Sequence, residues 1–364
     1  MNIKEIISVL EELAPLAYAE DFDNVGLLVG DQNAEATGVL VCHDALESVI
    51  DEAIAEKCNL VVCFHPILFS GLKKITGKNY VERSIIKAIK NDIAIYAVHT
   101  ALDNHQEGVN KIFCDALGLI NTKILIPKSN FTRKLVTYTV PENADQVRNA
   151  LFAAGAGNIG NYDNCSFNSE GFFTFKGNEN SHPVIGEKGK LHTGNEIKIE
   201  VIFEKQLENK ILKALIENHI YEEVAYEIYD LQNKNQNIGL GMIGELNAPM
   251  EEKSFLKFVK DKMQAQGIRH SSFTSKSVKK VAVLGGSGSF AIKNAIQAGA
   301  DVFLTADLKY HHFYEAENQL LLADIGHFES ERYTKNYIVD YLRKKIPNFA
   351  IILSEENTNP VKYL

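Results

Sequence analysis

The sequence has few cysteines, no strongly basic segment and no long apolar run. Its five cysteines form no CxxC pair, which disfavours a disulfide scaffold or a zinc ribbon and favours a reducing, cytoplasmic location. No run approaches the ~20 apolar residues of a membrane span, and the first residues form an acidic amphipathic pattern, not a signal peptide. The net charge of −9 argues against a nucleic-acid backbone as the main partner.

Several common catalytic signatures are also missing, namely GxSxG, the P-loop and HExxH. Gly285–Ser289 resembles the start of a dinucleotide fingerprint, but that pattern would need glycine where Ala291 stands. Two alternatives stay open for this segment. It is a turn that lets the next helix approach the sheet closely, or it receives a substrate phosphate at a helix N-terminus.

Alternating strands and helices are predicted in two separated parts of the 364 residues. The first part has buried-strand patterns at 38–42, 59–64 and 93–98, with helices at 2–13, 46–57 and 81–90. The second part has strands at 279–284, 301–305, 320–325 and 349–353, with helices at 290–298 and 329–345. Strands separated by helices of this length are typical of βαβ units around a parallel sheet.

The middle of the chain has a different pattern. Residues 131–140 alternate like a half-buried antiparallel strand, and further strands and helices are predicted at 144–152, 197–203 and 208–218. We therefore predict an α/β fold in which two α/β halves, residues 1–127 and 239–364, form one discontinuous domain. A smaller α+β insertion, residues 128–238, interrupts it.

Histidines and carboxylates follow the ends of several predicted strands. His65 comes directly after one strand, Asp103 follows the next, and His327 and Glu331 follow a third. In open α/β sheets, ligands bind beyond the carboxyl ends of the strands, so these four side chains share one rim. If the first helical turn includes His327, then Glu331 at i+4 faces the same way.

Each residue alone also has a purely structural interpretation. His65 could be an ordinary strand-end histidine, Asp103 an Asx turn or helix cap, and Glu331 a carboxylate stabilised by a helix dipole. Taken together, nitrogen and oxygen ligands without cysteine suit Zn, Mn or Fe. A carboxylate can bridge two such ions in a hydrolytic clamp.

Five segments carry a family resemblance that covers nearly the whole chain. They are Asp23–Gly30, Phe64–Pro66, His99–Asp103, Leu304–Asp307 and Gly326–Glu331. Together they resemble the NIF-three-like family, whose members are often labelled GTP cyclohydrolase 1 type 2 homologues. Three more segments resemble the family's optional inserted domain, which has a fold like the PII signalling and CutA copper-tolerance proteins: Gly155–Tyr162, Cys165–Phe167 and Tyr221–Tyr226.

The resemblance implies a dinuclear metal site held by His65, Asp103, His327 and Glu331, with Glu331 as the bridge. It also implies homohexameric toroids whose sites face an inner cavity that the inserted domain caps. The family usually has two adjacent histidines before the proline, and here the first is Phe64. One ion then keeps His65, Asp103 and Glu331, while a second, weaker site keeps only His327 and Glu331.

Cys63, His43 and His99 stay open as substitutes for the missing ligand. For function, the resemblance and the ligand set favour metal-dependent hydrolysis of a nucleotide or another small anionic substrate, with one or two ions per chain. His99 and His311 are the candidate proton shuttles, or else residues that orient the ligands. The alternative is a non-enzymatic metal-binding or regulatory toroid with a PII-like sensing domain.

Overall fold

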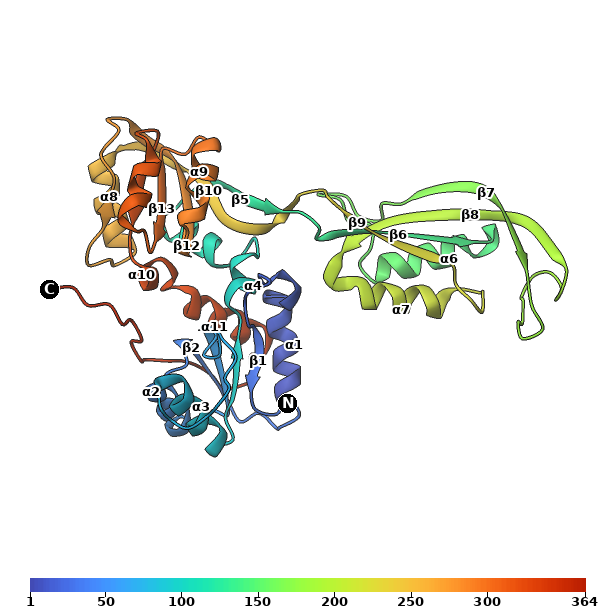
Figure 1. The fold of residues 1–364 in the computed structure, drawn as a ribbon, viewed down its shortest axis with the longest axis horizontal. Coiled ribbons are helices and arrows are strands. Elements are labelled where there is room, and N and C mark those ends of the chain that lie inside the picture. The colour runs from blue at the N-terminus through green and yellow to red at the C-terminus, as the bar shows by residue number, and fades with distance from the viewer. The chain divides into compact units, whose positions relative to one another are not determined.

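The computed structural model describes all 364 residues as a mixed α/β fold with three sheets. Contacts divide the chain into two compact units, which are described separately. The discontinuous unit comprises Met1–Pro127 and Gln236–Leu364, the blue-to-cyan and yellow-to-red parts of Figure 1, and the inserted unit comprises Lys128–Asn235. No helix in the chain is both long enough and apolar enough to cross a membrane.

The first sheet of the discontinuous unit has five strands in the order β1-β4-β3-β2-β15. Their bounds are β1 (Gly26–Val29), β4 (Ala94–Ala97), β3 (Leu60–His65), β2 (Val39–Asp44) and β15 (Ile351–Leu353). The last four are parallel to one another, and β1 runs antiparallel to β4 at the edge. The predicted parallel sheet is therefore correct except for this antiparallel edge strand, for which no helical crossover is needed.

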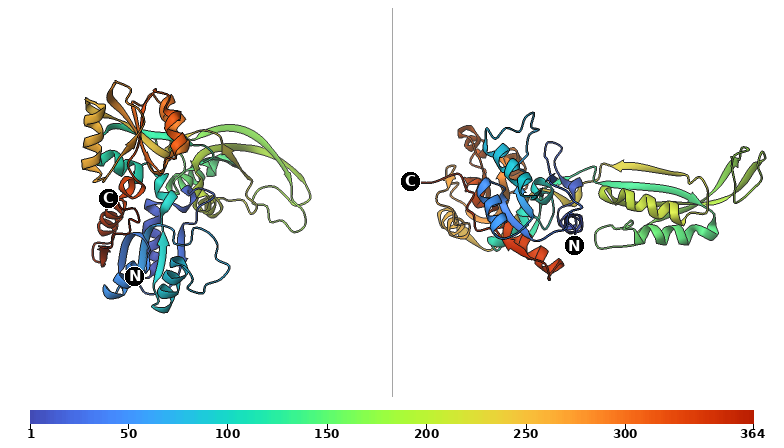
Figure 2. Two further views of the ribbon diagram at one scale, coloured as in Figure 1. Left: turned by 60° about the vertical axis from the view of Figure 1, so that its left-hand side comes forward. Right: turned by 90° about the horizontal axis from the view of Figure 1, so that it is seen from below.

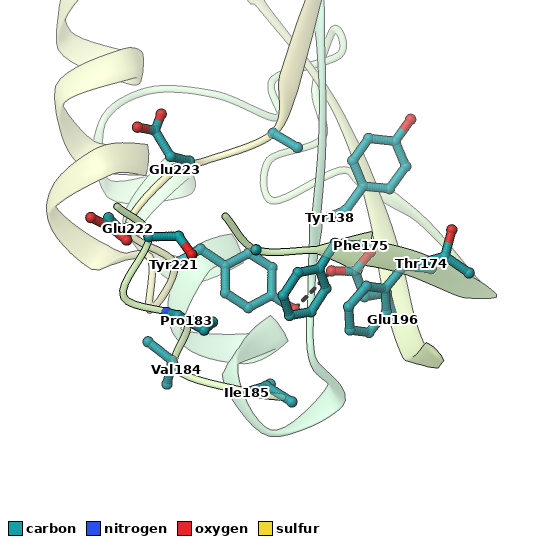
Figure 3. Close-up of a pocket in the computed structure, with 14 residues that line it drawn as sticks. Tyr138, Thr174, Phe175, Pro183, Val184, Ile185, Glu196, Tyr221, Glu222 and Glu223 are labelled. Carbon is teal, nitrogen blue, oxygen red and sulfur yellow. Dashed lines mark hydrogen bonds between the residues drawn. The ribbon is translucent and has the colours of Figure 1, made fainter. Parts of the chain in front are cut away.

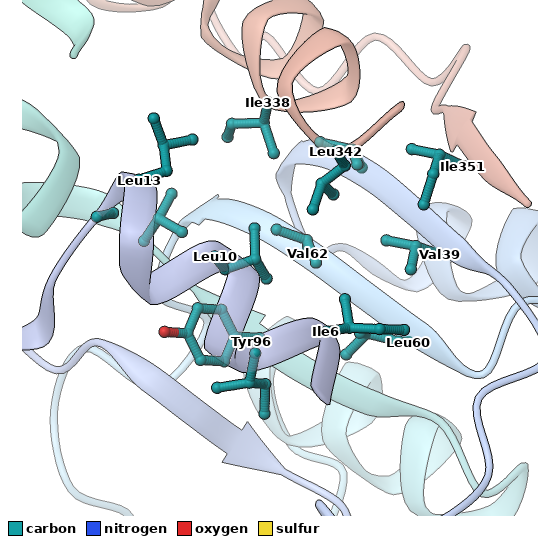
Figure 4. Close-up of a cluster of buried hydrophobic side chains, with 14 of the residues drawn as sticks. Ile6, Leu10, Leu13, Val39, Leu60, Val62, Tyr96, Ile338, Leu342 and Ile351 are labelled. Atoms are coloured by element: carbon teal, nitrogen blue, oxygen red, sulfur yellow. The ribbon is translucent and has the colours of Figure 1, made fainter. Parts of the chain in front are cut away.

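Helices cover both faces of this first sheet. One face packs on α1 (Ile3–Leu13) and α11 (Thr334–Lys345), and the other on α2 (Glu47–Ala55) and α3 (Tyr80–Lys90). Helix α1 forms because its apolar residues recur at helical spacing and a capping box between Asn2 and Glu5 satisfies its first N–H groups. Its buried Ile6 and Leu10 meet Tyr96 and Leu342 in the core of Figure 4.

The second sheet of the discontinuous unit has six strands in the order β11-β14-β13-β12-β10-β5. Their bounds are β11 (Arg269–His270), β14 (Leu321–Asp324), β13 (Val302–Ala306), β12 (Ser277–Ser287), β10 (Asn235–Glu251) and β5 (Ile120–Lys128). Only β12, β13 and β14 are parallel; β10 and β11 pair antiparallel with their neighbours. One face packs on α5 (Val109–Ala116) and α8 (Glu252–Lys262), and the other on α9 (Ile292–Gln297).

The predicted helix at 329–345 is wrong in one respect, because the structure has two helices there. Helix α10 (His327–Glu331) follows β14, and the chain bends at Arg332 and Tyr333 before α11 begins. The Arg332 guanidinium donates to the carbonyl of Met263, and the Tyr333 hydroxyl donates to the carbonyl of Lys262. These contacts hold the bend, so tertiary packing overrides the helical periodicity of the segment.

The inserted unit is a four-stranded antiparallel sheet in the order β7-β8-β6-β9. Its elements are β6 (Thr132–Thr139), α6 (Pro141–Ala153), β7 (Phe167–Lys176), β8 (Leu191–Glu204), α7 (Glu208–Asn218) and β9 (Tyr226–Leu231). Both helices lie on one face of the sheet in Figure 1 and Figure 2, over a core that includes Leu135, Val147 and Leu215. This βαββαβ order is the ferredoxin-like arrangement.

Candidate metal centre

The carboxyl ends of the parallel strands in both sheets of the discontinuous unit carry histidine and carboxylate side chains. Strands β2 and β3 end in register at Asp44 and His65. In the second sheet, Asp307 follows β13, and α10 after β14 begins with His327 and ends with Glu331. These side chains therefore lie at or just after strand ends, but the strands belong to two sheets and not to the single rim that the sequence analysis expected.

Three of the four residues expected to bind metal form a tight triangle. The Oε2 atom of Glu331 lies 3.3 Å from Nε2 of His65 and 3.3 Å from Nε2 of His327. The two Nε2 atoms are 3.4 Å apart. The edge of a tetrahedron around a zinc ion with bonds of about 2.0–2.1 Å is roughly 3.3–3.4 Å, so the spacing of these donor atoms fits a metal ion.

Two further carboxylates fix which nitrogen of each imidazole faces this triangle. Asp44 Oδ1 lies 2.8 Å from Nδ1 of His65, and Asp307 Oδ2 lies 2.7 Å from Nδ1 of His327. A carboxylate at this distance accepts the Nδ1 proton, which leaves Nε2 with a lone pair directed at the triangle. Such carboxylate–histidine pairs orient the ligand and raise its basicity in metal sites.

The electrostatics of the triangle favour a positive charge. Burial raises the pKa of Glu331, but the charge of His327 and the other interactions with neighbouring histidines together outweigh it and hold the pKa well below the usual range. Burial lowers the pKa of His65, but Asp44 and Glu331 together raise it to about 9. Burial also lowers the pKa of His327, but the charge of Glu331 and the hydrogen bond with Asp307 raise it to about 11. Protons or a metal cation can supply this charge, and the two compete for the same nitrogen atoms.

Asp103 lies at the end of the short helix α4 (His99–Asp103). Its Oδ1 atom is buried and has no hydrogen-bond partner. Burial, together with the negative charge of Glu331, raises the pKa of Asp103 well above its usual range. An orphaned carboxyl oxygen that is electrostatically coupled to the triangle fits a ligand whose partner is a cation.

His99 is held beside the triangle by a different carboxylate. Its Nδ1 lies 2.8 Å from Oδ1 of Asp23, and its ring centroid is 5.4 Å from that of His65. Burial raises the pKa of Asp23, but its hydrogen bonds with His99 and Thr100 outweigh this and lower the pKa to about 2. His99 is therefore an oriented imidazole next to the triangle.

His311 lies on the 3-10 helix η4 (Tyr310–Ala316), where its side chain is exposed. Its ring contacts are with Tyr310 and Tyr314. Of the two candidate shuttles, His99 is thus the one whose ring contacts a histidine of the triangle. Phe64 is fully buried in the core of the first sheet.

The glycine-rich segment after residue 284 packs against Glu331. Gly286 has φ +67°, and a Cβ atom placed on it would lie 2.5 Å from Oε1 of Glu331. Its N–H donates to the Ser330 hydroxyl, while the Ser287 hydroxyl donates to Asp307. The turn does allow a close approach, but its close neighbour is helix α10, whereas the sequence analysis expected the helix that follows the turn.

A pocket of about 390 Å³ lies beside the triangle. Its wall includes both triangle histidines and the guanidinium of Arg269, which pairs with Asp324. The remaining lining comes from the end of β2, from Asp307, from the start of α10 and from the C-terminal segment: His43, Asp44, Asp307, Gly326, Phe328, Glu329, Asn359, Pro360, Val361 and Tyr363. A small molecule in this pocket would therefore contact the candidate metal ligands directly.

The sequence as a whole matches the description Duf34/NIF3 (NGG1p interacting factor 3) over residues 1–360. The chain belongs to this family. A Bacillus subtilis relative named GTP cyclohydrolase 1 type 2 homolog is 40% identical over 370 residues, which cover 100% of this chain and 99% of the relative. A Staphylococcus epidermidis protein of the same name is 36% identical, with 100% of both chains covered.

Solved structures agree with this membership. The crystal structure of a Bacillus cereus protein related to NIF3 superposes with a TM-score of 0.87 at 39% identity, covering 100% of this chain and 99% of that one. The mixed α/β architecture is therefore that of a NIF3 protein along the whole chain.

Sequence reasoning missed four residues that shape the NIF3-type site: Asp44, Asp307, Asp23 and Gly286. Asp44 and Asp307 lie two residues past the ends of predicted strands, so the argument that selected His65 could have found them. Asp23 and Gly286 lie in segments that the sequence analysis singled out, but nothing in those segments showed which residue would face the site, because only the tertiary fold brings them there.

The inserted unit has its own pocket, of about 370 Å³. The side chains of Phe173, Phe175 and Tyr221 line it, and in Figure 3 the Tyr221 ring points toward Phe175 and Glu196. The Tyr221 hydroxyl donates a hydrogen bond of 2.7 Å to the nearly buried Glu196. No lysine, arginine or histidine belongs to the lining, whereas Glu222 and Glu223 do.

Proposed function

We propose that this NIF3-family chain is a metal-dependent hydrolase that acts on a nucleotide or another small anionic substrate. One observation supports the proposal above all: the buried Glu331 carboxylate lies 3.3 Å from imidazole Nε2 atoms beside a pocket of about 390 Å³. Buried donor atoms without hydrogen-bond partners, such as Oδ1 of Asp103, fit ligands that are completed by a cation.

The proposed ligands are His65, Asp103, His327 and Glu331, with Glu331 as the bridge between two ions. Nitrogen and oxygen donors without thiolate suit Zn, Mn or Fe. Phe64 cannot bind a metal, so we propose either one tightly held ion or an asymmetric pair in which the second ion is held more weakly.

A bound ion would supply Lewis acidity and lower the pKa of a water molecule toward neutrality. The chain's own residues would do the rest. Asp44 and Asp307 hold the two imidazoles with Nε2 directed at the ion. His99, oriented by Asp23, is the proposed proton shuttle because its ring lies next to His65. Arg269 on the pocket wall would face an anionic substrate.

Turnover tests the proposal directly. The purified chain would be loaded separately with Zn, Mn and Fe, and release of formate from GTP and of phosphate from a nucleotide panel would be measured. We expect turnover with at least one metal, and its loss in Asp103→Ala and in the milder Asp103→Asn, with both variants folded by circular dichroism. A fully metal-loaded chain without turnover on the panel would contradict the hydrolase and favour the regulatory alternative.

That alternative is a metal-binding regulatory protein whose inserted unit, which we propose is PII- or CutA-like, senses a small molecule. The pocket of about 370 Å³ favours it. Because the pocket combines aromatic rings with glutamates and no basic side chain, we expect an aromatic amine to bind in preference to the matching carboxylate. Ligand-observed NMR with paired aryl amines and aryl carboxylates would test this, and Glu196→Gln should weaken amine binding.

We also propose that the chain forms a homohexameric ring. Strand β7 lies at an edge of the inserted sheet, and its Phe167 and Phe172 are 67% and 86% exposed. Exposed aromatic residues on an edge strand support association with another chain. Native mass spectrometry should give six times the mass of one chain, and a monomer at micromolar concentration would contradict the proposal.

A further inference from the structure

His43 is a buried histidine outside the proposed ligand set. It is the next-to-last residue of β2, on the face of the sheet that also carries Val41. Strands β2 and β3 are parallel, with Asp44 opposite His65. His43 and Phe64 are therefore neighbours on the same face, and their ring centroids are 5.4 Å apart.

His43 lacks the hydrogen bonds that a buried histidine in a protein core normally makes. Its side chain is 3% exposed, and neither ring nitrogen has a hydrogen-bond partner. Buried polar groups of native proteins nearly always have one. His219 of the inserted unit shows the ordinary arrangement, with its Nε2 3.0 Å from the carbonyl oxygen of Tyr138.

The nearest charged group to Nε2 of His43 is the triangle's own carboxylate. Nε2 lies 3.3 Å from Oε2 of Glu331, the same distance as the corresponding atoms of His65 and His327. The donor atoms of His65, His327 and Glu331 lie within 4.8 Å of one another, and His43 is not part of that group. It therefore approaches the shared oxygen from a different side.

We propose that His43 is a metal ligand through Nε2, at a second ion position that shares Glu331 with the first. This inference rests on the proposed metal-binding function and adds a ligand to it. Position 64 on the adjacent strand holds phenylalanine where a histidine was expected, and the neighbouring His43 supplies an imidazole in its place. The triangle places His327 with His65 at the first ion, so a second ion held through His43 has an imidazole of its own.

Zinc binding to the full-length chain tests the proposal by isothermal titration, with cobalt(II) absorption as a spectroscopic count of imidazole ligands. In His43→Leu, the second and weaker zinc ion should be lost or bound at least tenfold more weakly while the first keeps its affinity, and a wild-type chain that binds a single zinc ion would overturn the proposal. His219→Gln is the matched control, since it removes a partly buried imidazole of the inserted unit whose Nε2 lies 3.0 Å from the carbonyl oxygen of Tyr138. Its zinc affinity should stay within threefold of wild type.

Folding is monitored separately, by thermal unfolding in the presence of a chelator. Leucine removes an unpartnered buried imidazole without opening a large cavity, so the metal-free His43→Leu variant should unfold no earlier than wild type. His43→Gln gives a second, polar replacement, and it should lose zinc to the same extent.

A reciprocal exchange tests the role of the neighbouring position. The double variant His43→Leu/Phe64→His should recover zinc affinity to within tenfold of wild type, because position 64 lies on the same face. Unchanged zinc binding in His43→Leu would overturn the proposal while leaving the metal-binding function intact. A wild-type chain that binds no zinc, manganese or iron would instead overturn the proposed function.

Discussion

Replacing Gly286 with alanine tests how closely the glycine-rich turn supports Glu331, the proposed metal ligand. The added Cβ would lie 2.5 Å from Oε1 of Glu331 and 3.3 Å from Cε1 of His327. Ordinary contact between such atoms is about 3.5 Å, so the carboxylate must retreat by about 1 Å. The backbone at φ +67° is also unfavourable for alanine.

The two effects of Gly286→Ala have different magnitudes and different readouts. The left-handed backbone should cost roughly 1–2 kcal/mol of folding stability. Metal–ligand distances tolerate only about 0.2 Å of error, so a displacement of about 1 Å should weaken zinc binding by at least tenfold. Fold stability would thus fall modestly while metal affinity falls strongly.

Gly118→Ala is the matched control for this variant. Its φ is +66°, and a Cβ there would have no neighbour within 4 Å. In urea unfolding, Gly118→Ala should therefore lose as much stability as the backbone of Gly286→Ala does, and adding a chelator should not change that loss. Isothermal titration should give wild-type zinc affinity for Gly118→Ala. Equal zinc affinity in Gly286→Ala and wild type, or equal losses in both variants, would refute the argument that Gly286 positions Glu331.

Two further predictions concern the carboxylates that hold the histidines. Asp307→Asn should weaken zinc binding by about 10–100-fold with little change in the fold, because the neutral amide no longer supplies the negative charge at Nδ1 of His327. An isothermal titration that matches wild type would contradict this. Asp23 has its pKa lowered from 3.8 to about 2, so it stabilises the folded chain above pH 3.8 and loses this contribution as the pH falls toward 2. Allowing for solvent screening, the free energy of unfolding of wild type should exceed that of Asp23→Asn by roughly 1 kcal/mol at pH 6. Urea unfolding should show this difference vanishing near pH 2, and a difference that does not depend on pH would contradict the prediction.

The parts of the fold with strong periodicity could be predicted from the sequence. The central strands β2, β3, β12 and β13 contain apolar runs at 39–42, 60–64, 281–284 and 302–304, and the structure buries all of these residues. The edges could not be predicted in the same way. Strand β1 is four residues long and only partly buried, and β10 owes its 17 residues to pairing with strands distant in sequence, so neither has a distinct local pattern.

The site could be predicted where it depends on strand ends and helical spacing. His65, His327 and Glu331 meet because the ends of strands from both sheets lie at the site and because α10 begins at His327. What the sequence left open was the surroundings. The faces of β2 and β3 on which the side chains lie decide these surroundings. They place Asp44 beside His65, and they bring His43, rather than Cys63, close to Glu331. Cys63 lies on the opposite face, in the cluster with α2 and α3.

The position of the triangle explains how the chain can carry a long insertion and still form one site. His65 precedes the inserted unit and His327 follows it, 262 residues later in the chain. Closing a loop costs only about 0.6 kcal/mol more for each doubling of its length, and an insertion that folds by itself adds little to that cost. A metal ion bound by both residues stabilises only the conformation in which the two halves are joined. The donor atoms thus lie where one ion can offset the entropy of bringing distant segments together. Glu331 is the residue on which this arrangement depends most, because all three imidazoles contact its carboxylate.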